Sequence, residues 1–147
     1  MKLQDGFLSA RLVGTPGICI RTADASSTIS IVKSLLTKGL NKQNAEAALA
    51  KLPLVSWDAI HGLTGVNDAG SAAVVSLCGS KQIDQAATAN LPIALTVVED
   101  AGQMDMVLFV HNAHLWWNID TLVIQGVWNT RDKFKANGNM LLLLVAL

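Results

Sequence analysis

The stretch Met106–Asn118, "MVLFVHNAHLWWN", is the part of the sequence that decides the fold. Its apolar run, Met106–Val110, leads directly into the polar residues His111, Asn112 and His114. A continuous apolar run of this length indicates a strand that is buried on both faces, as in a parallel sheet covered by helices. The carboxyl end of such a strand is where α/β proteins bind ligands. The stretch therefore predicts a fold class and the place of a candidate site.

Three other apolar runs have the same character, and amphipathic segments separate them. The further strands are expected at Gly17–Arg21, at Leu54–Trp57 and from Met140 toward Leu147. Apolar residues recur at helical spacing in residues 26–39, 42–52 and 118–138. Buried strands that alternate with amphipathic helices predict an α/β three-layer sandwich with a mostly parallel sheet of about four strands. Its crossovers should be right-handed.

Capping residues predict where two of these helices begin and end. Ser26 or Ser27 can cap the helix after the first strand, and Asn118 or Asp120 can cap the last helix. Gly39 and Gly138 are the corresponding stops. In the last helix, two apolar stripes are expected: Val123, Val127 and Phe134 form one, and Ile124 with Trp128 forms the other.

Two segments in the middle of the chain are harder to assign. Residues 58–80 are rich in glycine and are expected to be mostly loop. Within them, residues 69–79 could form a short helix or a strand, because periodicity favours neither. Residues 84–102 are expected to be helical, with Pro92 starting, kinking or splitting the helix.

Composition limits the class of protein. The chain has 147 residues, of which 51% are hydrophobic and 15% charged, and its formal net charge is zero. These values predict a single α/β domain over residues 1–147 with a real core. A neutral chain offers no field that would attract nucleic acid or an anionic membrane. We expect a cytoplasmic protein without a signal peptide or membrane span, and Cys19 and Cys78 are expected to be buried free thiols.

The last residues, "NMLLLLVAL" (Asn139–Leu147), form the most hydrophobic strand pattern in the chain. The pattern stops without a turn or a polar tail. We therefore expect that the chain is a fragment of a longer protein, or that another element covers this strand.

Polar residues follow each of the first three expected strands, and the carboxyl ends of parallel strands meet at one edge of the sheet. The candidate corner for a ligand or partner consists of Thr22, Asp24, Asp58, His61, His111, Asn112 and His114. A nucleotide site would need a glycine-rich loop and a lysine after the first strand. The sequence there is "TADASS", without glycine, and the first lysine is Lys33. A phosphate-binding loop is therefore not expected.

The third strand would end in an acidic pair in a magnesium-dependent enzyme of this class. Here His111 and Asn112 stand in that place, and neither provides the anionic oxygen that magnesium prefers. We expect no catalytic residues and no metal site. The alternative, zinc on His111 and His114, would need further ligands from His61, Asp58, Asp24 or Cys78, and no spacing ties these together.

Other candidate residues have ordinary structural explanations. Asp24 and Asp58 could be paired carboxylates, but such residues more often cap the following segment. Of the adjacent Trp116 and Trp117, one is expected to pack in the core. The other should be exposed, because neighbouring residues in regular structure face different ways, and an exposed tryptophan is a candidate interface anchor.

The ordering "GICIRTAD … LVSWDAIHGL … DMVLFVHNAHLWWN … VWNTRDKFKANGNMLLLLVAL" resembles the N-terminal, P-loop-deficient α/β domain of certain AAA-type ATPases of bacteria, plastids and phage-related genomes. The landmarks that carry the resemblance span nearly the whole chain. They are Thr22, Trp57-Asp58 with Gly62, Asn112 with His114, and Leu141–Leu144.

The resemblance implies a degenerate, incomplete relative of the P-loop (RecA-like) fold. It implies a non-catalytic domain that acts in inter-domain or subunit packing, or in substrate positioning. The expected partners are an AAA module or further copies of the chain, and ATP and magnesium would belong only to a module outside this chain. The alternative is a stand-alone small α/β ligand-binding protein or enzyme with its site at the strand carboxyl ends.

Overall fold

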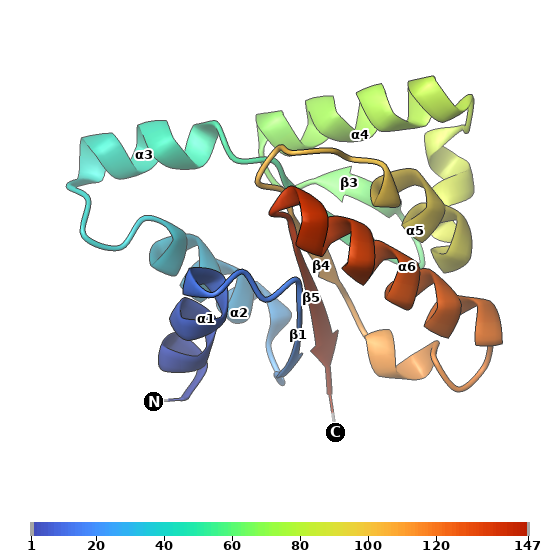
Figure 1. Ribbon diagram of the computed structural model, residues 1–147, viewed down its shortest axis with the longest axis horizontal. Helices are drawn as coiled ribbons and strands as arrows, with labels where there is room; N and C mark the ends of the chain where they lie inside the picture. The colour runs from blue at the N-terminus through green and yellow to red at the C-terminus, as the bar shows by residue number, and fades with distance from the viewer. Residues whose placement is uncertain (1, 147) are drawn as a thin grey trace.

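The computed structural model describes residues 2–146 and contains a five-stranded open sheet (Figure 1). Its strands are β1 (Gly17–Arg21), β2 (Leu54–Asp58), β3 (Gly62–Gly65), β4 (Val107–Val110) and β5 (Met140–Val145). They lie in the order β1-β5-β4-β2-β3; the first four in this order are parallel, and β3 is antiparallel to β2. The expected α/β fold with a mostly parallel sheet is confirmed.

Helices cover both faces of the sheet, as Figure 1 shows. On one face lie α1 (Lys2–Leu12), α2 (Ala25–Leu36) and α3 (Lys42–Ala50). On the other lie α4 (Asp68–Lys81), α5 (Leu91–Glu99) and α6 (Thr121–Asn137), together with the short helices η1 (Gln85–Ala89) and η2 (Ala113–Leu115). The buried side chains of β5 alternate between the two cores, with Leu141 on the α6 side and Leu142 on the α2 side.

The order of the strands fixes where a ligand could enter. The chain crosses from β1 to β2 with α2 and α3 on one face, and returns through β4 to β5 with α4, α5 and α6 on the other. The connections that follow β1 and β4 therefore leave on opposite faces. Such a switch point opens a crevice at the carboxyl ends of the strands.

Helices α1 and α2 cover one face of strand β1, and on the other face the Arg131 side chain of α6 reaches Gly17. Ile20 is buried beside Phe7 of α1 in the core of the α2 side. Cys19 points to the opposite face and is exposed, so the expectation of a buried thiol is wrong at this position. The physical reason is that α1 and α2 lie on the other face, while α6 packs against β5. Cys78, in α4, is buried as expected, and both thiols are free.

Local chemistry explains the helix boundaries. Asp24, rather than Ser26 or Ser27, caps α2, and Asp120 caps α6, with each carboxylate accepting a backbone N–H bond. Gly138 ends α6 in the left-handed conformation, as expected, whereas α2 ends at Leu36, before Gly39.

Several features differ from the sequence-based expectations. The ambiguous segment 69–79 is helical and belongs to α4, so residues 58–80 are not mostly loop. Strand β3 and helix α1 were not expected. Pro92 lies in the first turn of α5 and splits residues 84–102 into η1 and α5, since a proline is tolerated at a helix start. Leu147, the expected end of the last strand, lies outside the described residues.

No helix within residues 2–146 has both the length and the apolar character that crossing a membrane requires.

Candidate functional site

The carboxyl ends of β1, β4 and β5 enclose a small pocket at the switch point. Its volume is ≈ 130 Å³, and it is lined by Thr22, Ala23, Ala25, His111, Asn112, Leu144, Val145 and Ala146. Three of the expected corner residues, Thr22, His111 and Asn112, are thus brought together from two strands that are far apart in sequence. We call this pocket the corner pocket.

The carboxylate of Asp24 caps the backbone N–H groups at the start of α2, beside this pocket. Ser27 donates its backbone N–H to Asp24 Oδ1 at 3.1 Å and its hydroxyl to Oδ2 at 2.6 Å. Thr22 Oγ1 accepts from the Asp24 N–H at 3.0 Å and from the Thr28 hydroxyl at 2.7 Å. Asp24 is therefore a helix cap, and Thr22 is committed to shaping the turn.

This cap has an electrostatic consequence. The hydrogen bond from the Ser27 hydroxyl, followed by that from its backbone N–H, lowers the pKa of Asp24, so the carboxylate is ionised at neutral pH. A helix N-terminus attracts phosphate through its free N–H groups and its dipole. Here an anion of the protein already occupies that position. The start of α2 is consequently a poor phosphate site.

His111 and Asn112 follow β4 at the position that an acidic pair would occupy in a magnesium-dependent enzyme of this class. The His111 backbone N–H donates to the Trp57 carbonyl at 2.9 Å, which places the imidazole beside the end of β2. Burial lowers the pKa of His111, and the negative charge of Asp58 raises it by a smaller amount. His111 is therefore neutral at pH 7. Asn112 is exposed and adopts the left-handed conformation, with φ 54°, which asparagine tolerates well.

Asp58 and His61 form a separate pair in the turn between β2 and β3. Asp58 Oδ1 accepts the backbone N–H groups of Ile60 and His61, both at 2.8 Å, and His61 Nδ1 lies 3.0 Å from Asp58 Oδ2. Burial raises the pKa of Asp58, but the hydrogen bonds from His61 and Ile60 outweigh it, and the pKa is lowered overall. Asp58 thus stabilises a turn, in line with the capping explanation.

His114 lies at the edge of the corner, where its Nδ1 accepts the backbone N–H of Ala146 at 3.4 Å. The expected corner therefore divides into the pocket residues Thr22, His111 and Asn112 and the turn pair Asp58–His61. The charge of Asp58, which acts on His111, links the two parts. Within residues 2–146, no group of three His, Cys, Asp or Glu side chains is arranged to hold a metal ion.

The titration of His111 tests this geometry. We expect its pKa to lie below 6.5, and Asp58→Asn to lower it further, because the substitution removes the negative charge that partly offsets desolvation. Because the folded state favours the neutral imidazole, the contribution of His111 to stability is fully present at pH values above the pKa that this histidine has in the unfolded chain. That contribution is lost as the pH falls through the range between the two pKa values. NMR titration of the imidazole Cε1–H signals of both proteins measures the effect; a raised pKa in Asp58→Asn would contradict the arrangement.

The tryptophans near the corner are less exposed than expected. Trp116 and Trp117 are both partly buried and pack against the core, so the expectation that one of them is exposed is wrong. Trp116 meets the buried Trp57 edge to face, with ring centroids 5.9 Å apart. The short helix η2 bends the chain here, so the alternation of regular structure does not apply.

The exposed tryptophan of this region is Trp128 in α6, at 52%. The Arg131 guanidinium stacks over its ring at 3.8 Å, a cation–π contact. An apolar hollow of ≈ 180 Å³ is lined by Trp117, Ile124, Val127 and Trp128, which we call the α6 flank. Further exposed apolar residues lie just before it in the chain: Leu115, Ile119 and Leu122. The sequence predicts the Ile124–Trp128 stripe, but its pattern does not show that this stripe is the exposed one.

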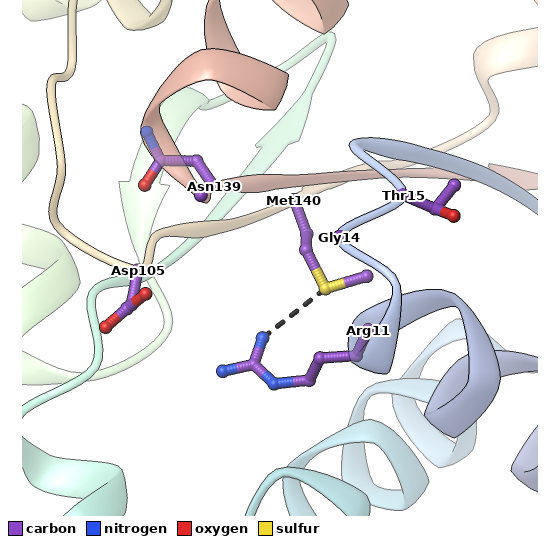
Figure 2. Close-up of a pocket in the computed structure, with 7 residues that line it drawn as sticks. Arg11, Gly14, Thr15, Asp105, Asn139 and Met140 are labelled. Carbon is purple, nitrogen blue, oxygen red and sulfur yellow. Dashed lines mark hydrogen bonds between the residues drawn. The ribbon is translucent and has the colours of Figure 1, made fainter.

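A larger hollow, of ≈ 230 Å³, lies at the opposite end of the strands (Figure 2). In it the Arg11 guanidinium donates to the Met140 sulfur at 3.4 Å, and Asp105 lies on the far wall. Gly138, at the carboxyl end of α6, also borders it. The carboxylate and the negative end of the helix together balance the arginine charge. The hollow is therefore lined by one positive and one negative side chain, and no sequence motif marks it as a site.

Comparison of the chain with protein-family models, with curated proteins and with solved structures finds no match.

Proposed function

We propose that the chain is a non-catalytic packing domain of the degenerate RecA-like kind that precedes the ATPase module in AAA-type proteins. Its role is to dock against a neighbouring ATPase module through the α6 flank. The sequence landmarks described above motivate the family, and the mostly parallel sheet is compatible with it.

The single observation that carries the docking role is the exposure of the α6 flank. Trp128 and Ile124 lie one turn apart on α6 and are 52% and 45% exposed. Large aromatic and aliphatic side chains grouped around a hollow are typical anchors of protein interfaces. The arginine stacked on Trp128 fixes the ring orientation before a partner binds, which lowers the entropic cost of docking.

The corner pocket supports the non-catalytic part of the proposal. Its nearest helix start is capped by Asp24, and the residues after β4 are a neutral histidine and an amide. These groups offer neither the positive charge that binds nucleotide phosphates nor the carboxylate that binds magnesium.

One observation favours the alternative, a small-ligand protein. A neutral imidazole, a hydroxyl and an amide line one pocket at the place where α/β proteins bind ligands. The pocket measures ≈ 130 Å³, however, against about 300 Å³ or more for ordinary ligand pockets. We therefore rank the packing domain first.

Calorimetric titration with ATP and magnesium separates the two functions. We expect no saturable heat, because the start of α2 is occupied by the Asp24 carboxylate. The double variant His111→Ala/Asn112→Ala should behave like the natural chain, also in an assay of ATP hydrolysis. Saturable binding or hydrolysis that the double variant loses would contradict the packing role and support the enzyme.

A further inference from the structure

The outer edge of β1 is an unpaired sheet edge within residues 2–146. The Leu141 N–H donates to the Pro16 carbonyl at 2.8 Å, and the Thr22 N–H donates to the Val145 carbonyl at 2.8 Å. In a strand, the backbone groups of alternate residues point to the same side. Pro16, Ile18, Ile20 and Thr22 therefore bond toward β5, and Gly17, Cys19 and Arg21 direct their N–H and C=O groups outward.

The opposite edge of the sheet, at β3, is closed by side chains. The Leu63 N–H donates to Thr88 Oγ1 at 2.9 Å, and the Leu63 carbonyl accepts from Gln85 Nε2 at 2.9 Å. Natural proteins cover sheet edges in this way to prevent unwanted pairing. At β1 the outer side instead opens into a groove of ≈ 270 Å³, lined by Leu3, Gly6, Phe7 and residues 18–21. An open edge of this kind is a template for another strand.

We propose that β1 pairs antiparallel with β1 of a second copy of this chain, about a two-fold axis through Cys19. A symmetric interface of this type requires a strand that is complementary to itself. The strand "GICIR" meets this requirement, because Ile18 and Ile20 flank Cys19 symmetrically. The inference goes beyond the docking role of the α6 flank and does not depend on it.

The pairing places compatible side chains opposite each other. On the α1 side, Ile18 of one copy faces Ile20 of the other above the apolar groove. On the other side, Arg21 of one copy faces Gly17 of the other, where Arg131 Cγ lies 3.8 Å from the Cβ position and the Arg131 guanidinium is paired with Asp132. The two Arg21 residues lie at opposite ends of the paired strands, so their charges are kept apart, and the zero net charge of the chain adds no repulsion between copies.

Cys19 provides a direct probe of this geometry. Two directly opposed residues that exchange hydrogen bonds have Cα atoms about 5.5 Å apart, which lies within the range that a disulfide spans. The Cys19 thiol is exposed, and Cys78 is buried. Oxidised glutathione would join the two Cys19 sulfurs by exchange, with two molecules of reduced glutathione released for each disulfide formed.

The experiment is made in the Ile124→Ser/Trp128→Gln background, in which association through the α6 flank is weakened, and compares this background chain with its Cys19→Ser and Cys19→Glu derivatives. Under reducing conditions, sedimentation velocity should give a dimer for the background chain and for its Cys19→Ser derivative. The Cys19→Glu derivative should sediment as a monomer and keep the circular dichroism spectrum of the folded chain, because it places two carboxylates directly opposite each other at an exposed position. With oxidised glutathione, only chains that retain Cys19 should give a disulfide-linked dimer on a non-reducing gel.

Two results would overturn the proposal. One is a background chain that is monomeric and forms no linked dimer with oxidised glutathione; association seen only in the natural chain would then place the contact at α6. The other is a dimer of unchanged mass in the Cys19→Glu derivative.

Discussion

Alanine in place of Gly70 is expected to destabilise the protein by about 3 kcal/mol or more. Gly70 lies in the first turn of α4, where the helix rests on the start of β2. A Cβ at this position would lie 1.9 Å from the Leu54 carbonyl oxygen and 2.7 Å from its carbon. Both atoms belong to the backbone of a strand that is buried in the sheet, so the helix would have to move.

Movement of α4 would also break the contacts of its capping residue. Asn67 Oδ1 accepts from the Gly70 N–H at 2.8 Å and from the Leu54 N–H at 3.2 Å, and its amide nitrogen donates to the Leu49 and Leu52 carbonyls. One side chain thus joins α3, β2 and α4, and a displaced helix would leave several of these polar groups unpaired.

Urea unfolding followed by tryptophan fluorescence measures the loss. Gly79→Ala is the matched control, because Gly79 lies on the same helix and nothing lies within 4 Å of its Cβ position. Alanine there should stabilise the helix by about 0.5–1 kcal/mol. If the free energy of unfolding of Gly70→Ala lies within about 0.5 kcal/mol of that of the natural chain, the close approach of α4 to β2 is wrong.

The elements that the sequence predicts correctly are those with long runs of one pattern. Four strands of nearly continuous apolar residues are found where they are expected, because burial on both faces leaves no other composition. Helix α6 is also found, since Asp120 and Gly138 supply clear start and stop chemistry. Strand β3, "GLTG", has too few apolar residues for a pattern, and it forms through pairing with β2.

The candidate site could be predicted in its position but not in its contacts. The rule that parallel strands end at one edge brings Thr22 and His111 together correctly. It cannot show that Asp24 and Asp58 are committed to local turns, because those bonds depend on backbone geometry. The exposure of Cys19 has a similar cause. It depends on which helices cover β1, which is a property of the tertiary fold.

The second large expected effect concerns the α6 flank. With no docking partner present, its apolar side chains should contact other copies of the chain, so the isolated protein should self-associate. The double variant Ile124→Ser/Trp128→Gln removes the two largest exposed groups of the hollow and should weaken this association by about tenfold or more. Both residues are about half exposed, so the variant should keep the fold.

Val75→Gln is the matched control. Val75 lies on α4, away from the flank, and is 65% exposed. The substitution Val75→Gln removes an exposed apolar side chain and leaves α6 unchanged. A general effect of surface hydrophobicity would appear in both variants, whereas an effect of the docking surface would appear only in the flank variant.

Sedimentation velocity of the three proteins over a range of concentrations tests the packing role most directly. The predicted result is that average mass rises with concentration equally for the natural chain and for Val75→Gln, and clearly less for Ile124→Ser/Trp128→Gln. Coincident curves for all three proteins, or a natural chain whose mass does not change with concentration, would contradict the assignment of the α6 flank as a docking surface.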